Sequence, residues 1–151
     1  MLRFLQRFFG DDGDERRPPD EHDVRVATCA LFVEMASIDG EFSAQETAQI
    51  LDGLKSRYGL PEEHARTLLD QAQREAAQSI DLWTFTNRIN EYYSTDEKLQ
   101  IVEILWNIVF ADGRMDDHEH YLMSKLVGLL RLEHGQVFGM KAKIKAAHAN
   151  R

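Results

Sequence analysis

The chain contains a single cysteine, Cys29, and no long apolar run among its 151 residues. One cysteine excludes an internal disulfide and a zinc site built from several cysteines. Its apolar neighbours in residues 27–31 predict a buried, inert thiol. No stretch approaches the roughly 18 apolar residues that a membrane span requires, and the first nine residues are too short for a signal peptide. We therefore expect a cytoplasmic location.

Basic residues are also few, with 18 Lys and Arg against 26 Asp and Glu and a formal net charge of −8. A nucleic-acid-binding surface needs clustered Lys and Arg to contact phosphates, so we predict no nucleic-acid partner. The charge is compatible with simple solubility, with cation binding or with a basic partner. Motifs for catalysis are missing too: we find no Gly-rich phosphate loop, no Gly-x-Ser-x-Gly and no Cys–His pair. We predict that the chain is not an enzyme.

The apolar residues follow the helical period of 3.6, and no useful stretch alternates with the period of two that is typical of strands. The segment 99–111 is apolar on almost every side, which places it in the middle of a helical bundle. We predict an all-α fold of about seven helices in two pseudo-repeated halves over residues 24–148. The expected helices cover residues 24–38, 43–58, 61–79, 81–93, 99–111 and 116–130, followed by a last basic helix with Lys141, Lys143 and Lys145.

The segment Met1–Phe9 precedes this domain and has aromatic and basic residues at helical spacing, so it predicts a short amphipathic helix. Residues 10–23, rich in Gly, Pro and charge, predict a flexible linker. Three roles remain open for the helix: docking in a groove of a protein partner, folding back on the domain, or lying on the inner membrane surface with Arg3 and Arg7 at the headgroups. Nine residues bind a membrane only marginally, which favours the first two roles.

An Asp-Gly turn occurs twice, at Asp39-Gly40 and Asp112-Gly113, in the segments DGEFSAQE (39–46) and DGRMDDHE (112–119). Both segments fit the frame Asp-Gly-x-apolar-(Ser/Asp)-x-x-Glu. Each follows an apolar helix and precedes an amphipathic one, and the two copies lie 112 − 39 = 73 residues apart. The repeat indicates two related helix-turn-helix halves.

Two interpretations of the turns stay open. In the first, glycine ends one helix, and the pairs Ser43/Glu46 and Asp116/Glu119 cap the next one. In the second, the carboxylates bind a hard divalent cation such as Ca²⁺, Mg²⁺ or Mn²⁺. The turns match only the later positions of a calcium-binding EF-hand loop, because apolar residues or Ser37 occupy the first and third positions. A cation would then either bind weakly through a partial set of oxygens, or bind where the two turns converge and pool their carboxylates.

With these turns and the Trp-containing segment 97–113 in view, residues 24–148 resemble the TerB-like family, named for tellurite resistance. The family is also similar to the N-terminal helical domain of DjlA-type membrane co-chaperones. The resemblance implies an all-helical bundle of two similar halves, acidic residues proposed to bind divalent metal, and links to stress response and membrane-associated complexes. The residues that carry over as metal ligands are Asp39, Glu46, Asp112, Asp116 and Glu119. Arg114 stands where the first copy has Glu41, so the second turn lacks one carboxylate.

The combined hypothesis is a non-enzymatic, stress-related helical module that binds a divalent cation weakly at the acidic turns and acts through protein partners. The alternative is a pure protein-interaction scaffold, in which the turns only cap helices and no metal binds. The oligomeric state stays open.

Overall fold

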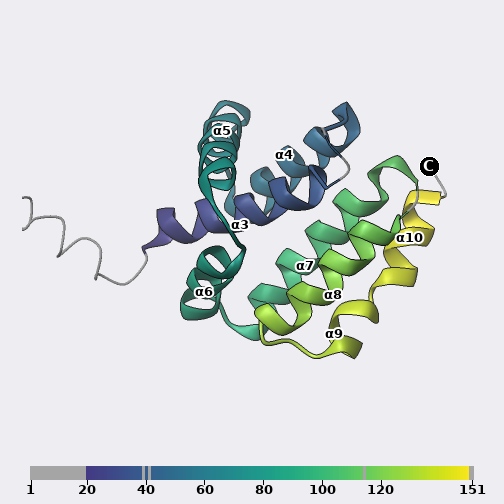
Figure 1. Cartoon of the computed structure of the whole chain (residues 1–151). Coiled ribbons are helices and arrows are strands. Elements are labelled where there is room, and N and C mark those ends of the chain that lie inside the picture. Colours follow the sequence, from purple (N-terminus) through teal and green to yellow (C-terminus); the bar gives the residue numbers. More distant parts are fainter. Residues whose placement is uncertain (1–19, 39, 41, 114, 150–151) are drawn as a thin grey trace, which may run out of the picture.

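The computed structural model describes residues 20–149 apart from 39, 41 and 114 (Figure 1). This part of the chain is all-α, as predicted, and contains eight α-helices, one short 3-10 helix and no strand. In chain order the elements are α3 (Glu21–Ala36), α4 (Ala44–Tyr58), α5 (Glu62–Gln78), α6 (Trp83–Tyr92), α7 (Thr95–Val109), η1 (Phe110–Asp112), α8 (Asp117–Leu129), α9 (His134–Phe138) and α10 (Lys141–Ala149). None of these described helices is both long and apolar enough to cross a membrane.

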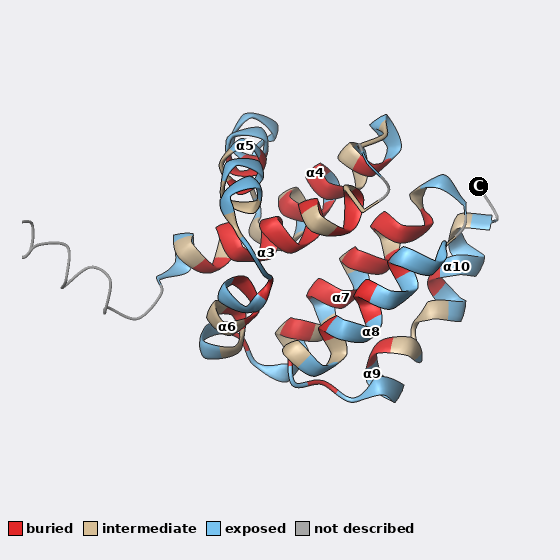
Figure 2. Ribbon diagram, in the orientation of Figure 1, coloured by how far each residue is buried: buried red, intermediate tan, exposed pale blue. Residues whose placement is uncertain are grey.

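Two helices, α3 and α7, form the centre of the bundle. α3 packs against α4, α5, α6 and α7, and α7 in turn contacts α4, α9 and α10. Both are buried along most of their length (Figure 2), because apolar side chains occupy nearly every face of each helix. Each is the long apolar helix that precedes one of the two Asp-Gly turns.

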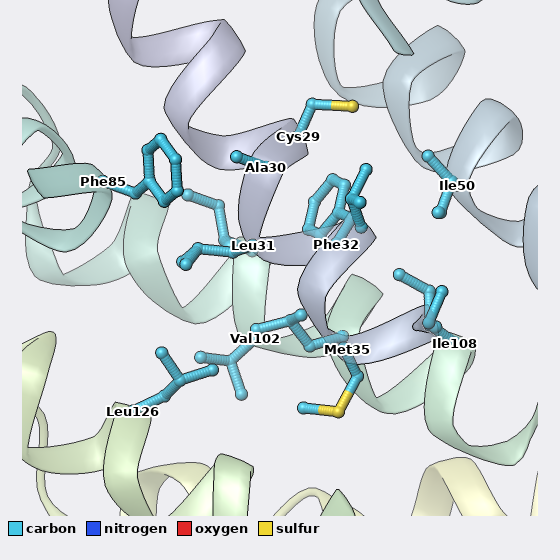
Figure 3. Close-up of a cluster of buried hydrophobic side chains, with 14 of the residues drawn as sticks. Cys29, Ala30, Leu31, Phe32, Met35, Ile50, Phe85, Val102, Ile108 and Leu126 are labelled. Carbon is cyan, nitrogen blue, oxygen red and sulfur yellow. The ribbon is translucent and has the colours of Figure 1, made fainter. Parts of the chain in front are cut away.

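One hydrophobic core joins the two halves. Figure 3 shows Leu31, Phe32 and Met35 of α3 in a cluster to which α4, α6, α7 and α8 also contribute side chains. Cys29 lies in the same core with no exposed surface, and burial raises the pKa of its thiol. The thiol is therefore inert, as the sequence predicts.

The structure corrects one boundary and adds one helix. α3 begins at Glu21 rather than near Val24, because Asp20 and Asp23 form a reciprocal capping box at its start. The last residues of the predicted linker 10–23 are thus helical, and the rest of that linker and the predicted helix Met1–Phe9 lie outside the described residues. The sequence did not predict α9, because five residues are too few to show an apolar period.

A buried lysine and an asparagine cover the end of α8. Lys98 of α7 donates from Nζ to the Leu130 carbonyl at 3.1 Å, and Asn90 of α6 donates from Nδ2 to the Leu129 carbonyl at 2.8 Å. Burial lowers the pKa of Lys98, and the charge of Arg131 adds to this effect. The last carbonyls of α8 would otherwise lack partners, so these two side chains tie the end of α8 to α6 and α7.

Replacing Arg131 by glycine is expected to stabilise the fold by about 0.5–1 kcal/mol. Arg131 follows α8 in the left-handed conformation, at φ 57°, while the N–H of Leu132 closes the turn on the Val127 carbonyl at 2.9 Å. Glycine removes the Cβ strain, although it also adds freedom to the unfolded chain. Urea unfolding measures the change. Arg131→Ala removes the same charge but keeps Cβ, so an equal gain in that variant would show that strain is not the cause.

Candidate functional site

The first acidic corner connects α3 to α4. Gly40 adopts φ 121°, a conformation that favours glycine, and Ser43 is the N-cap of α4. The Ser43 N–H donates to Glu46 Oε1 at 2.9 Å, and the Glu46 N–H donates to Ser43 Oγ at 3.0 Å. Phe42 packs against the core. The predicted Ser43/Glu46 cap is therefore confirmed, whereas α3 already ends at Ala36, with Ser37 rather than Gly40 as its C-cap.

The second corner repeats this geometry between η1 and α8. Gly113 has φ 96°, and Asp116 is the N-cap. The Asp116 N–H donates to Glu119 Oε1 at 3.0 Å, and the Glu119 N–H donates to Asp116 Oδ1 at 2.9 Å. Met115 packs against the core as Phe42 does in the first corner. The repeat read from the sequence is thus a repeat in three dimensions.

The capping glutamates of both corners are buried. Glu46 retains 4% of its surface and Glu119 retains 3%. This is unusual, because carboxylates are rarely buried so far. Each glutamate places Oε1 on the N–H of its own cap, which satisfies that oxygen and fixes the side chain. The two side chains are therefore held rigidly inside the molecule.

Carboxylates of both corners affect the ionisation of Glu119. The pKa of Glu119 is raised to about 7, chiefly by burial and then by the charges of Asp116, Asp112 and Glu46, while the backbone hydrogen bond at Asp116 opposes the rise. Since Coulomb repulsion falls with distance, the effect of Glu46 places carboxylates of both halves within electrostatic range. The packing of α4 against η1 produces this approach.

Four of the five predicted ligands are near enough for their charges to affect one another at Glu119: Glu46, Asp112, Asp116 and Glu119 itself. Asp112 and Asp116 are exposed at the surface beside the buried pair. The fifth, Asp39, lies outside the described residues. Among the residues that are described, no three His, Cys, Asp or Glu side chains are arranged to hold a metal ion. The donors are all carboxylate oxygens, which suit hard cations, but a complete ligand cage is not formed within this set.

Another capping box offers an internal comparison. Ser94 and Glu97 make the same pair of hydrogen bonds at the start of α7, at 2.9 and 3.2 Å. Glu97 is only half-buried, and it faces Arg57 at 3.7 Å rather than other carboxylates. Capping alone therefore does not require a buried, mutually repelling pair. The Asp-Gly frame predicted the caps, but no signal in the sequence showed the burial of Glu46 and Glu119.

One comparison with known proteins identifies a family. Residues 25–142 match the sequence model of the family described as tellurite resistance protein TerB, a range that includes both corners. No curated protein and no solved structure matches the chain. The match covers well over half of the 151 residues. The chain therefore belongs to the tellurite resistance protein TerB family, as the resemblance of its two acidic corners suggested.

Proposed function

We propose that this chain is a non-enzymatic, stress-related module whose two acidic corners bind one divalent cation weakly, and which acts through protein partners. Ca²⁺, Mg²⁺ and Mn²⁺ fit the carboxylate donors. The observation that carries the proposal is the buried Glu119, whose pKa is raised by burial and by carboxylates from both halves. Family membership supports the link to stress.

The charge of a bound cation would stabilise the ionised form of Glu119. Burial and three neighbouring carboxylates disfavour the ionised form of Glu119, and a bound cation would reverse this by supplying the opposite charge. Glu46, Glu119, Asp112 and Asp116 are the described residues that would hold it, with Asp39 the further candidate. Because Glu46 and Glu119 start helices in different halves, a shared cation would hold those halves together. A partner protein could then distinguish the cation-bound form from the free form.

Titration of the full chain with Mg²⁺, Ca²⁺ or Mn²⁺, followed by NMR and calorimetry, tests the proposal. We expect a saturable shift of the Glu46 and Glu119 amides at about millimolar cation, as for weak carboxylate sites. Because a cation must displace the proton, binding should be tighter at about pH 8 than at about pH 6. Glu46→Gln and Glu119→Gln should each weaken binding about tenfold or more, since each removes a charged ligand.

Glu97→Gln is the matched control, because it makes the same change in a capping box that faces Arg57. Equal weakening by this variant would mean that the cation acts through general charge. Absence of a saturable shift at millimolar cation would reject the cation site. It would favour the second candidate, a pure interaction scaffold, which the complete reciprocal capping bonds of both corners support.

A further inference from the structure

A groove of 520 Å³ lies beside the first corner, between the C-terminal parts of α3 and α5. Its walls are mainly apolar and include Val33, Phe42, Ala76 and Ala77, while Glu34 supplies a carboxylate. An apolar wall with one acidic group is suited to an amphipathic segment that carries both apolar and basic side chains.

The carboxylate of Glu34 favours an occupant with a positive charge. Its side chain is half-buried in the groove, and burial raises the pKa of the carboxyl. Within the described part of the chain, no ion pair includes Glu34. A basic side chain placed here would stabilise the ionised carboxylate and so offset the hydration that burial removes.

We propose that the chain's own segment Met1–Phe9 docks in this groove. Its aromatic residues Phe4 and Phe8 would cover the apolar walls, and Arg3 or Arg7 would face Glu34. The two phenylalanines are four residues apart, and so are the two arginines, so each pair shares a face if the segment is helical. The segment and the groove thus have opposite charges, and both offer apolar surface to the contact.

The connection is long enough for this docking. Glu34 lies 34 − 21 = 13 residues from the start of α3, which corresponds to about 20 Å of helix. Residues 10–20 are 11 residues and span up to about 36 Å when extended. The segment can therefore run back along α3 and reach the groove within the same molecule.

Another mainly apolar groove, of 190 Å³, lies nearer the start of α3 but fits the segment less well. Its rim includes Arg25 together with His22 and His64. Arg25 would repel Arg3 and Arg7, and the groove offers less than half of the volume. Docking beside the first corner is therefore favoured by charge as well as by size.

Hydrogen exchange on the full chain tests the proposal. A docked segment should protect the amides of the last turns of α5, residues 73–78, because helix ends open locally unless they are covered. We expect the double variant Phe4→Ser/Phe8→Ser to speed exchange there about fivefold or more, by loss of apolar burial. Tyr121→Ser removes an aromatic side chain that is 69% exposed on α8 and serves as the control that leaves this exchange unchanged.

Charge reversal gives an independent measurement. Arg3→Glu/Arg7→Glu and Glu34→Lys should each speed exchange of residues 73–78, and the three changes combined should restore protection because the charges again attract. Unchanged exchange in the phenylalanine variant overturns the proposal. So does loss of protection confined to the rim of the smaller groove. Binding of the wild type to phosphatidylserine vesicles, with no effect of the phenylalanine variant on exchange without vesicles, would assign the segment to a membrane instead.

Discussion

Replacing Trp106 by alanine is expected to lower the free energy of unfolding by about 3–5 kcal/mol, the largest effect of any substitution considered for this protein. Trp106 has no exposed surface. Its Nε1 donates to the Val137 carbonyl at 2.9 Å, and its ring contacts Phe110 and Phe138 with centroids 5.9 and 5.3 Å away. The substitution removes a large buried ring and leaves a carbonyl of α9 without its partner. Urea unfolding followed by circular dichroism measures the loss.

Two further variants help to separate the loss of the buried ring from the loss of its hydrogen bond. Trp106→Phe keeps most of the ring but removes the N–H, so it should cost about 1–3 kcal/mol. Trp83→Ala is the matched control, because Trp83 is 59% exposed at the start of α6, and surface changes usually alter stability by less than about 0.5 kcal/mol. A loss at Trp106 no larger than that at Trp83 would contradict the role assigned to this side chain.

Replacing Glu119 by glutamine should stabilise the protein at alkaline pH by about 1–3 kcal/mol. The pKa of Glu119 rises from its ordinary 4.5 to about 7 in the folded chain, a shift of 7 − 4.5 = 2.5 units, for which about 3 kcal/mol is the upper limit. Glutamine cannot ionise, yet it can still accept the hydrogen bond from the Asp116 N–H that completes the capping box.

The sign of the pH dependence follows from proton linkage. As pH rises above about 4.5, Glu119 loses its proton in the unfolded chain but keeps it in the folded one, so wild-type stability falls until the pH passes about 7. Glu119→Gln lacks this loss. The difference between variant and wild type should therefore be near zero below about pH 4.5 and reach its full value by about pH 8.

Urea unfolding of both proteins over this pH range, without divalent cations, measures the difference directly. Subtracting wild type from variant removes the contributions of the other titrating groups. Glu97→Gln changes the same atoms in the capping box that faces Arg57, and we expect no comparable gain there. A difference that stays constant from acid to alkaline pH would show that burial and the carboxylates around Glu119 do not raise its pKa in the folded chain.

The sequence by itself determined the features that depend on residues close together in the chain. Ser43 and Glu46 are three residues apart, as are Asp116 and Glu119, so helix geometry alone brings each pair into a capping box. Gly40 and Gly113 also occupy the turns at φ 121° and 96°, a backbone conformation that favours glycine. The apolar period likewise indicated the all-α fold and its central helix, because every residue on a helix face shares one environment.

Only the tertiary structure decided what lies around those caps. Glu46 and Glu119 are 119 − 46 = 73 residues apart, and their electrostatic coupling depends on how α4 packs against the second corner. The same holds for the two tryptophans: Trp106 is fully buried and Trp83 is exposed, although both are the same residue type within helices. Local pattern specifies a helix and its ends, whereas burial depends on contacts between distant segments, and that burial makes Glu119 chemically different from Glu97.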